Sequence, residues 1–183
     1  MSELITMRGA ENFIGFQQFL KFLEDNSDLK NSTVVEIGSY TGESTIMFAQ
    51  KVKSVIAIDP FMNDYDPNDD TCHAADLPTT VYQKFLERTA PYQNITHIQK
   101  TSDDAVADLA GQQFDIVYID GIHTYEQVKK DIENYRGLVK PGGFLCGHDY
   151  GDHGHIAGVY KAVNEMLGKP DITFQDLSWV VKL

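Results

Sequence analysis

Short runs rich in β-branched and aromatic residues alternate with segments of helical periodicity along most of this 183-residue chain. The runs are apolar almost throughout, which is typical of strands that are buried on both faces of a parallel sheet. We expect such strands at 33–37, 54–59, 94–99, 114–120 and 142–148. The helical segments lie at 10–25, 44–51, 79–89, 102–109, 125–138 and 156–167.

The last two apolar segments, 172–175 and 178–183, have no helix between them, so they should form an antiparallel hairpin at one edge of the sheet. Right-handed crossovers between the other strands then give an α/β fold with a doubly wound, Rossmann-like sheet of seven strands. We predict a single domain over residues 1–183, in which residues 1–30 form an N-terminal helical cover.

Four phenylalanines recur along the first helical segment, at Phe13, Phe16, Phe19 and Phe22. We expect them to pack this helix onto the sheet. Two alternatives are that the aromatic stripe forms a homodimer face or part of a cover over a substrate.

The net charge of the chain limits the classes of partner that it can bind. Asp and Glu number 27 against 15 Lys and Arg, a formal net charge of -12. Such a surface repels phosphate groups, so we expect no nucleic-acid or membrane partner. No apolar run approaches the roughly 20 residues of a membrane span, and no signal peptide is visible. The two cysteines, Cys72 and Cys146, form no metal or redox motif. We therefore expect a cytoplasmic protein.

Residues 60–78 are rich in Asp, Asn and Pro and have no clear period. They follow the second expected strand, at whose carboxyl end open α/β sheets bind ligands. A loop of this length is either a lid over a ligand or a solvated acidic insert.

The turn after the first strand, EIGSYTGES (36–44), points to a ligand site. Glycine allows close approach of the backbone, and the following helix start offers unpaired N–H groups. The second strand ends in Asp59, and an acidic side chain at this position can accept hydrogen bonds from ribose hydroxyls. Together these features predict an adenosine-containing cofactor.

The turn does not fit nucleotide cofactors that carry phosphates. A dinucleotide fingerprint needs G-x-G-x-x-G, but Tyr40 and Glu43 stand where its second and third glycines would be. No G-K-[ST] sequence follows for a phosphate loop. S-adenosylmethionine, which has ribose and adenine, no phosphate and a positive sulfonium, suits the acidic residues Glu36 and Asp59.

The segments EIGSYTGEST, AIDPF and YIDGIHTYEQVKKDIENYRGLVKPGGFLCGHDY resemble the class I S-adenosylmethionine-dependent methyltransferases, over roughly residues 30–165. The resemblance implies that Asp59 holds the ribose and that Ser102 and Asp103 meet the adenine. For Ser102 the alternative is a helix N-cap. The wall around the methionine part would be formed by Glu36, Gly38, Ser39, Tyr40, Gly42 and Ser44.

A second group of polar residues follows the fourth and fifth strands, at Asp120, His123, His148 and Asp149. Carboxylates with a little imidazole nitrogen suit Mg²⁺ or Mn²⁺, and a site richer in histidine suits Zn²⁺ or Fe²⁺. The alternative is that Asp120 bonds only the cofactor, that His123 caps a helix and that Asp149 caps a loop. Asp152-His153-Gly154-His155 lies just downstream, and its histidines either line the acceptor pocket or are solvated.

This second group resembles the site of metal-dependent O-methyltransferases, of the catechol and macrolide-sugar types. The resemblance implies a divalent cation on Asp120, His148 and Asp149, although the sugar-modifying relatives have an acidic residue where His148 stands. Asp120 would also contact the cofactor, and Asp120 and His123 would be catalytic, with His123 as the base. The expected reaction is O-methylation of a small hydroxylated acceptor.

Two other functions fit parts of the sequence. The chain could be a non-catalytic S-adenosylmethionine-binding protein or partner subunit, or a metal-dependent hydrolase built on the Asp and His residues.

The pairs Glu126–Lys130 and Gln127–Asp131 are expected to lie on the exposed face of their helix.

Overall fold

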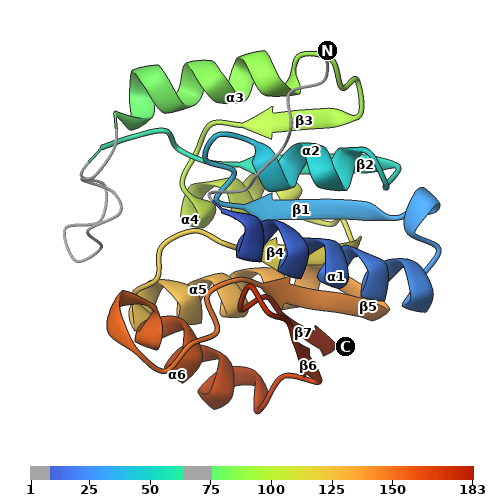
Figure 1. Ribbon diagram of the computed structural model, residues 1–183, viewed down its shortest axis with the longest axis vertical. Coiled ribbons are helices and arrows are strands. Elements are labelled where there is room, and N and C mark those ends of the chain that lie inside the picture. Colours follow the sequence, from blue (N-terminus) through green and yellow to red (C-terminus); the bar gives the residue numbers. More distant parts are fainter. Residues whose placement is uncertain (1–8, 64–75) are drawn as a thin grey trace.

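The computed structural model describes residues 9–63 and 76–183. In these residues seven strands form one sheet, in the order β3-β2-β1-β4-β5-β7-β6 (Figure 1). The strands are β1 (Thr33–Ile37), β2 (Ser54–Ile58), β3 (Ile95–Ile98), β4 (Phe114–Ile119), β5 (Val139–Gly147), β6 (Ile172–Thr173) and β7 (Trp179–Lys182).

The α-helices of the described residues are α1 (Ala10–Asn26), α2 (Glu43–Ala49), α3 (Tyr82–Thr89), α4 (Ser102–Ala105), α5 (Tyr125–Tyr135) and α6 (Ala157–Leu167). Short 3₁₀ helices lie at η1 (Leu29–Asn31), η4 (Val106–Leu109), η5 (Arg136–Leu138) and η6 (Gly154–Ile156). A π-helical turn, η3 (Leu77–Val81), leads into α3.

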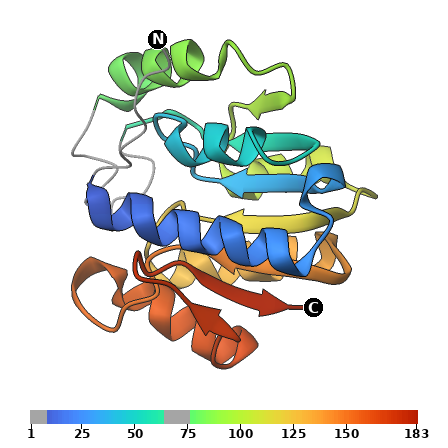
Figure 2. The same ribbon diagram turned by 45° about the vertical axis from the view of Figure 1, so that its right-hand side comes forward.

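The pairing of the strands confirms the predicted α/β fold. β1 lies between β2 and β4, and all pairs from β3 to β5 are parallel. β7 runs antiparallel to both β5 and β6, at the edge that Figure 2 shows beside the C-terminus. The chain order reverses between β1 and β4, and in such sheets ligands bind at the carboxyl ends of the strands beside this switch point.

Helices cover both faces of the sheet, which explains why most residues of its central strands are apolar. Val34 of β1 packs in a cluster with α1 and α2, whereas its neighbour Val35 packs with α4, α5 and α6 on the opposite face. On β4, Ile116 packs in the cluster with α1 and α2, and Val117 packs in the cluster with α4, α5 and α6. Successive side chains of a strand point to opposite faces, so both must be apolar.

The aromatic stripe of α1 forms part of the core. Phe16 and Phe19 are fully buried, and their rings lie 5.7 and 5.4 Å from that of Tyr118 on β4. Phe13 and Phe22 are partly buried against the same cluster. The core interpretation of the stripe therefore accounts for Phe16 and Phe19.

β5 begins at Val139, three residues earlier than expected. Its register with β4 shifts, because Phe114 pairs with Val139 but Ile116 pairs with Phe144. The irregularity leaves Pro141 and Gly142 exposed, so a proline without an N–H is tolerated near the start of the strand.

Three features considered in the sequence reach beyond the described residues. Most of the expected lid, 60–78, lies outside them, as do Cys72 and the first part of the N-terminal cover. In 9–63 and 76–183, no helix is long and apolar enough to cross a membrane.

Candidate active site

Residues with an unusual backbone conformation gather at the carboxyl edge of the sheet. Tyr40, Phe61 and Asp149 follow β1, β2 and β5, and each has a positive φ, at 45°, 48° and 60°. This conformation costs free energy in residues other than glycine and is concentrated at functional sites. The carboxyl edge of the sheet therefore has the unusual backbone conformations that are typical of a functional site.

Gly38 brings the first turn close to the end of β4. Its φ is 85°, and a Cβ atom at this position would lie 2.0 Å from the carbonyl oxygen of Asp120. Only glycine fits there. Gly42, with a φ of 78°, turns the chain into α2.

Glu36 holds the turn after β1 in place from the interior of the fold. Its side chain has no exposed surface, and its carboxylate accepts hydrogen bonds from the hydroxyls of Ser44 and Thr45 on α2. Burial raises the pKa of Glu36 to about 8, although these two hydrogen bonds oppose the shift. Both Glu36 and Ser44 therefore have structural partners within the fold.

Asp59 ties together the loops after β1 and β2. Its Oδ2 accepts from the backbone N–H of Tyr40 and its Oδ1 from that of Phe61, each at 2.8 Å. Burial raises its pKa, against the effect of these hydrogen bonds. Each carboxylate oxygen has a further lone pair, so ribose hydroxyls remain possible donors.

An open pocket of about 580 Å³, including its part open to solvent, lies beside these loops. Three of the predicted cofactor residues line it: Gly38, Ser102 and Asp103. Other predicted cofactor residues are not among its lining, and Ser39 and Ser44 are almost fully buried. The other lining residues are Ile37, Ile58, Pro60, Thr101, Gly121, Ile122, Gln127 and Asp131.

One alternative and one expectation about the pocket residues were wrong. The N-cap of α4 is Thr101, whose hydroxyl accepts from the N–H of Asp104, and Ser102 is the first helical residue. Asp131 is 1% exposed rather than solvated, because it lies on the same face of α5 as Val128 and Ile132. Glu126 and Lys130 are exposed, as predicted.

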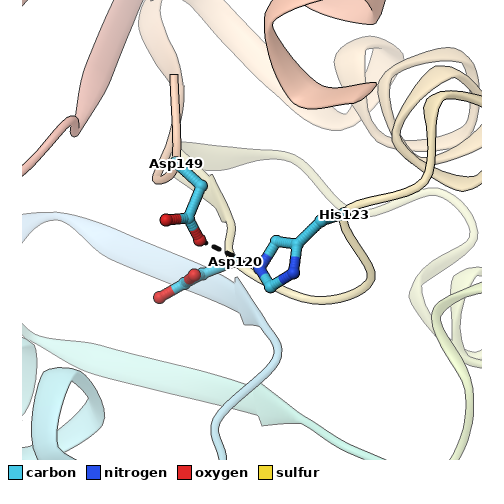
Figure 3. Close-up of side chains that lie close together, drawn as sticks. All are labelled: Asp120, His123 and Asp149. Carbon is cyan, nitrogen blue, oxygen red and sulfur yellow. Dashed lines mark ion pairs between the residues drawn. The ribbon is translucent and has the colours of Figure 1, made fainter. Parts of the chain in front are cut away.

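Asp120, His123 and Asp149 converge at the ends of β4 and β5 (Figure 3). Each offers one ligand atom, and these atoms lie within 4.8 Å of one another. Nε2 of His123 is 2.9 Å from Oδ2 of Asp149. Burial would raise the pKa of Asp149, but hydrogen bonds from His123 and His148 outweigh it and hold the pKa well below its usual value.

His148 lies beside this group as a positive charge. Its Nδ1 is 3.2 Å from Asp149 and 3.8 Å from Asp120, and its Nε2 is 3.8 Å from Asp176. Burial would lower the pKa of His148, but the three carboxylates outweigh it and raise the pKa to about 9. At neutral pH the raised pKa favours the protonated imidazole, so a cation would have to displace a proton to bind His148.

The two downstream histidines, His153 and His155, lie in different surroundings. The side chain of His153 is 74% exposed, whereas the ring of His155 lies 5.7 Å from that of His123. Asp176 was not singled out from the sequence, because its position in the turn before β7 gives no local signal.

Residues 35–150 match the model of a family described as "Methyltransferase domain". This match covers the first turn, Asp59, the pocket and the Asp–His group. The chain belongs to this family, and it is a class I S-adenosylmethionine-dependent methyltransferase. The assignment goes against the hydrolase alternative.

Curated relatives of this methyltransferase include a protein of Acanthamoeba polyphaga mimivirus, 29% identical over 168 residues, which are 86% of this chain and 71% of the relative. A protein of Sinorhizobium fredii is 27% identical over 149 residues, or 80% of this chain, but the match spans only 16% of that much longer protein.

Solved structures share the fold of this methyltransferase. The O-methyltransferase NovP has a TM-score of 0.69 at 15% identity, over 98% of this chain and 82% of NovP. A putative caffeoyl-CoA O-methyltransferase from Staphylococcus aureus has a TM-score of 0.64 at 16% identity, over 91% of this chain and 82% of that one. At such identities the likeness extends to the fold alone.

Proposed function

We propose that this methyltransferase transfers a methyl group from S-adenosylmethionine to a hydroxyl of a small molecule. The observation that carries the proposal is the contact of His123 with Asp149, beside Asp120, at the sheet edge where the cofactor pocket opens. Gly121 and Ile122, between Asp120 and His123, line that pocket. An acceptor held at the Asp–His group would thus lie next to a methyl donor in the pocket.

The cofactor is proposed to bind from the first turn to the start of α4. Gly38 and Gly42 allow close approach of the backbone, and Asp59 provides acceptors for the ribose hydroxyls. Ser102 and Asp103 line the pocket at its adenine end. Glu36 and Ser44 support the turn from inside the fold, and Ser39 and Tyr40 lie within it.

His123 is the proposed general base. Because its Nε2–H donates to Asp149, the basic nitrogen of the neutral imidazole is Nδ1, which is buried and must become accessible to take the proton of the acceptor hydroxyl. Asp149 orients the ring and stabilises the imidazolium that forms. S-adenosylmethionine supplies the electrophilic methyl group, and the walls of the site align the acceptor oxygen with it.

The carboxylates of Asp120 and Asp149 lie close together and offer oxygen atoms that a hard divalent cation accepts. We propose Asp120 and Asp149 as its oxygen ligands, with His148 joining only after it loses its proton. When bound, such a cation would lower the pKa of an acceptor hydroxyl. If it binds, removal of divalent cations with EDTA will lower turnover and Mg²⁺ will restore it, and Asp149→Asn will abolish this response. Turnover indifferent to EDTA would contradict the metal.

The acceptor is proposed to be small and not a nucleic acid. The net charge of -12 opposes binding of phosphate backbones. His155, next to His123, is the exposed residue through which an acceptor would meet the site.

The test is the conversion of S-adenosylmethionine to S-adenosylhomocysteine with a panel of catechols, phenols and sugars. We expect O-methylated products with some members of the panel, and loss of product in the His123→Gln variant. Methylation at nitrogen or carbon, or product formation that His123→Gln leaves unchanged, would contradict the proposal.

A further inference from the structure

A carboxylate of α5 lies buried against the pocket with one oxygen unsatisfied. Oδ1 of Asp131 accepts from the Ser102 hydroxyl at 2.6 Å and from Nε2 of Gln127 at 3.1 Å. Oδ2 is buried and has no hydrogen-bond partner within the described residues. Buried polar atoms of this kind are rare and costly, so an oxygen without a partner calls for an explanation.

The surroundings of Asp131 suggest what its partner is. Ser102 and Gln127 line the pocket with it, and both direct their hydrogen bonds to Oδ1. The facing walls are apolar, with Ile37, Ile58 and Ile122. A flat apolar ring that presents an N–H donor at its edge would fill this space and satisfy Oδ2.

We propose that Asp131 recognises the 6-amino group of the adenine of S-adenosylmethionine, through a hydrogen bond to Oδ2. This inference rests on the proposed function, because it places the cofactor in this pocket. It makes Asp131, on the helix after β4, a specificity-determining residue in addition to the residues after β3 that the sequence indicated.

The electrostatics of the carboxyl agree with this role. Burial raises the pKa of Asp131 to about 7, and the hydrogen bonds from Ser102 and Gln127 offset only part of the shift. An amino donor at Oδ2 would favour the ionised form. A 6-oxo purine would instead bring a carbonyl oxygen against Oδ2, so that two acceptors would face each other.

The test compares S-adenosylhomocysteine with S-inosylhomocysteine, which differs from it in carrying oxygen in place of the 6-amino group. Calorimetric titration gives the Kd of each ligand for the parent protein, for Asp131→Asn and for Glu133→Gln. Glu133 is the matched control, because it is exposed on the same helix and the substitution changes the charge equally. We expect the parent to prefer S-adenosylhomocysteine by roughly 10-fold to 100-fold, the range for a mispaired buried polar group.

Asp131→Asn should lower this preference by about 10-fold or more, since the amide can donate to a 6-oxo group. Glu133→Gln should keep it. If Asp131→Asn weakens both ligands equally, Asp131 is structural and the inference is overturned. If the parent protein binds S-adenosylhomocysteine and S-inosylhomocysteine equally well, the inference about Asp131 is overturned as well, and this result does not depend on whether Asp131→Asn folds. The proposed function would still stand in that case. No binding of S-adenosylhomocysteine by the parent would overturn both.

Discussion

The imidazole of His123 and the carboxylate of Asp149 are in direct contact, with 2.9 Å between Nε2 and Oδ2, although they come from the ends of two different strands. This contact exists because β4 and β5 are parallel neighbours, with Ile119 paired to Gly147. The pairing of β4 with β5 therefore places His123 next to the carboxylate that orients it. It does so without any sequence motif that contains both residues.

His123→Ala should reduce turnover by roughly 10²-fold to 10⁴-fold, the usual contribution of a general base. The affinity for S-adenosylhomocysteine should stay within about 2-fold of the parent value, because the proposed cofactor pocket is lined by other residues. Steady-state kinetics and calorimetry measure the two effects separately. Equal losses in turnover and in cofactor affinity would identify a structural histidine instead.

Asp59→Asn should weaken binding of S-adenosylhomocysteine by about 10-fold or more, because an amide nitrogen would face one of the two backbone N–H groups that the carboxylate now accepts. Asp108→Asn, at an exposed carboxylate of η4, is the control and should bind as the parent does. Unchanged affinity in Asp59→Asn would show that the ribose does not lie at the end of β2.

Gly38→Ala should destabilise the fold by about 3 kcal/mol or more, since the new Cβ would lie 2.0 Å from the carbonyl oxygen of Asp120. Gly111→Ala separates the backbone cost from the clash, because Gly111 also has a positive φ but has no atom within 4 Å of an added Cβ. It should cost only about 1–2 kcal/mol. Urea denaturation of both variants measures this difference, and similar costs would mean that the close approach of the two loops is unimportant.

Glu36 should make the protein less stable as the pH rises. Its pKa is about 8 in the folded protein, above the ordinary 4.5, so the folded state holds this proton more tightly than the unfolded state. The contribution of Glu36 to the free energy of unfolding is complete below the pKa that Glu36 has in the unfolded chain, and it is lost as the pH rises through the pKa in the folded protein. Each unit of pKa difference between the two states corresponds to about 1.4 kcal/mol. Unfolding free energies of the parent should therefore fall between about pH 5 and pH 8. Glu36→Gln should flatten this fall, and an identical pH profile in the two proteins would refute the assignment.

The regular elements were predictable because the strands are buried on both faces. A strand such as β4 is apolar at every position except Asp115, so its residues, 114–119, stand out from the helices around it. β5 was harder, since a proline and two glycines obscure its start. The π-helical turn before α3 leaves no periodic pattern that the sequence could reveal.

The placement of candidate-site residues was predictable where they follow strand ends, as Asp59, Asp120 and Asp149 do. Asp131 was missed because its pairing with Gln127 four residues earlier resembles an exposed polar face. Val128, Ile132 and Tyr135 mark the buried face of α5, and their spacing places position 131 on it. The raised pKa of His148 could not be predicted, because it arises first from the charge of Asp120 and then from Asp149 and Asp176, and Asp120 and Asp176 come close to His148 only in the fold.

The central claim is that the turn after β1 and the loop after β2 hold S-adenosylmethionine. Calorimetric titration of the protein with S-adenosylmethionine and S-adenosylhomocysteine, with EDTA and with added Mg²⁺, tests it most directly. We predict that one molecule binds per chain with a Kd on the order of micromolar, about −8 kcal/mol. No binding of either ligand under any of these conditions would contradict the account.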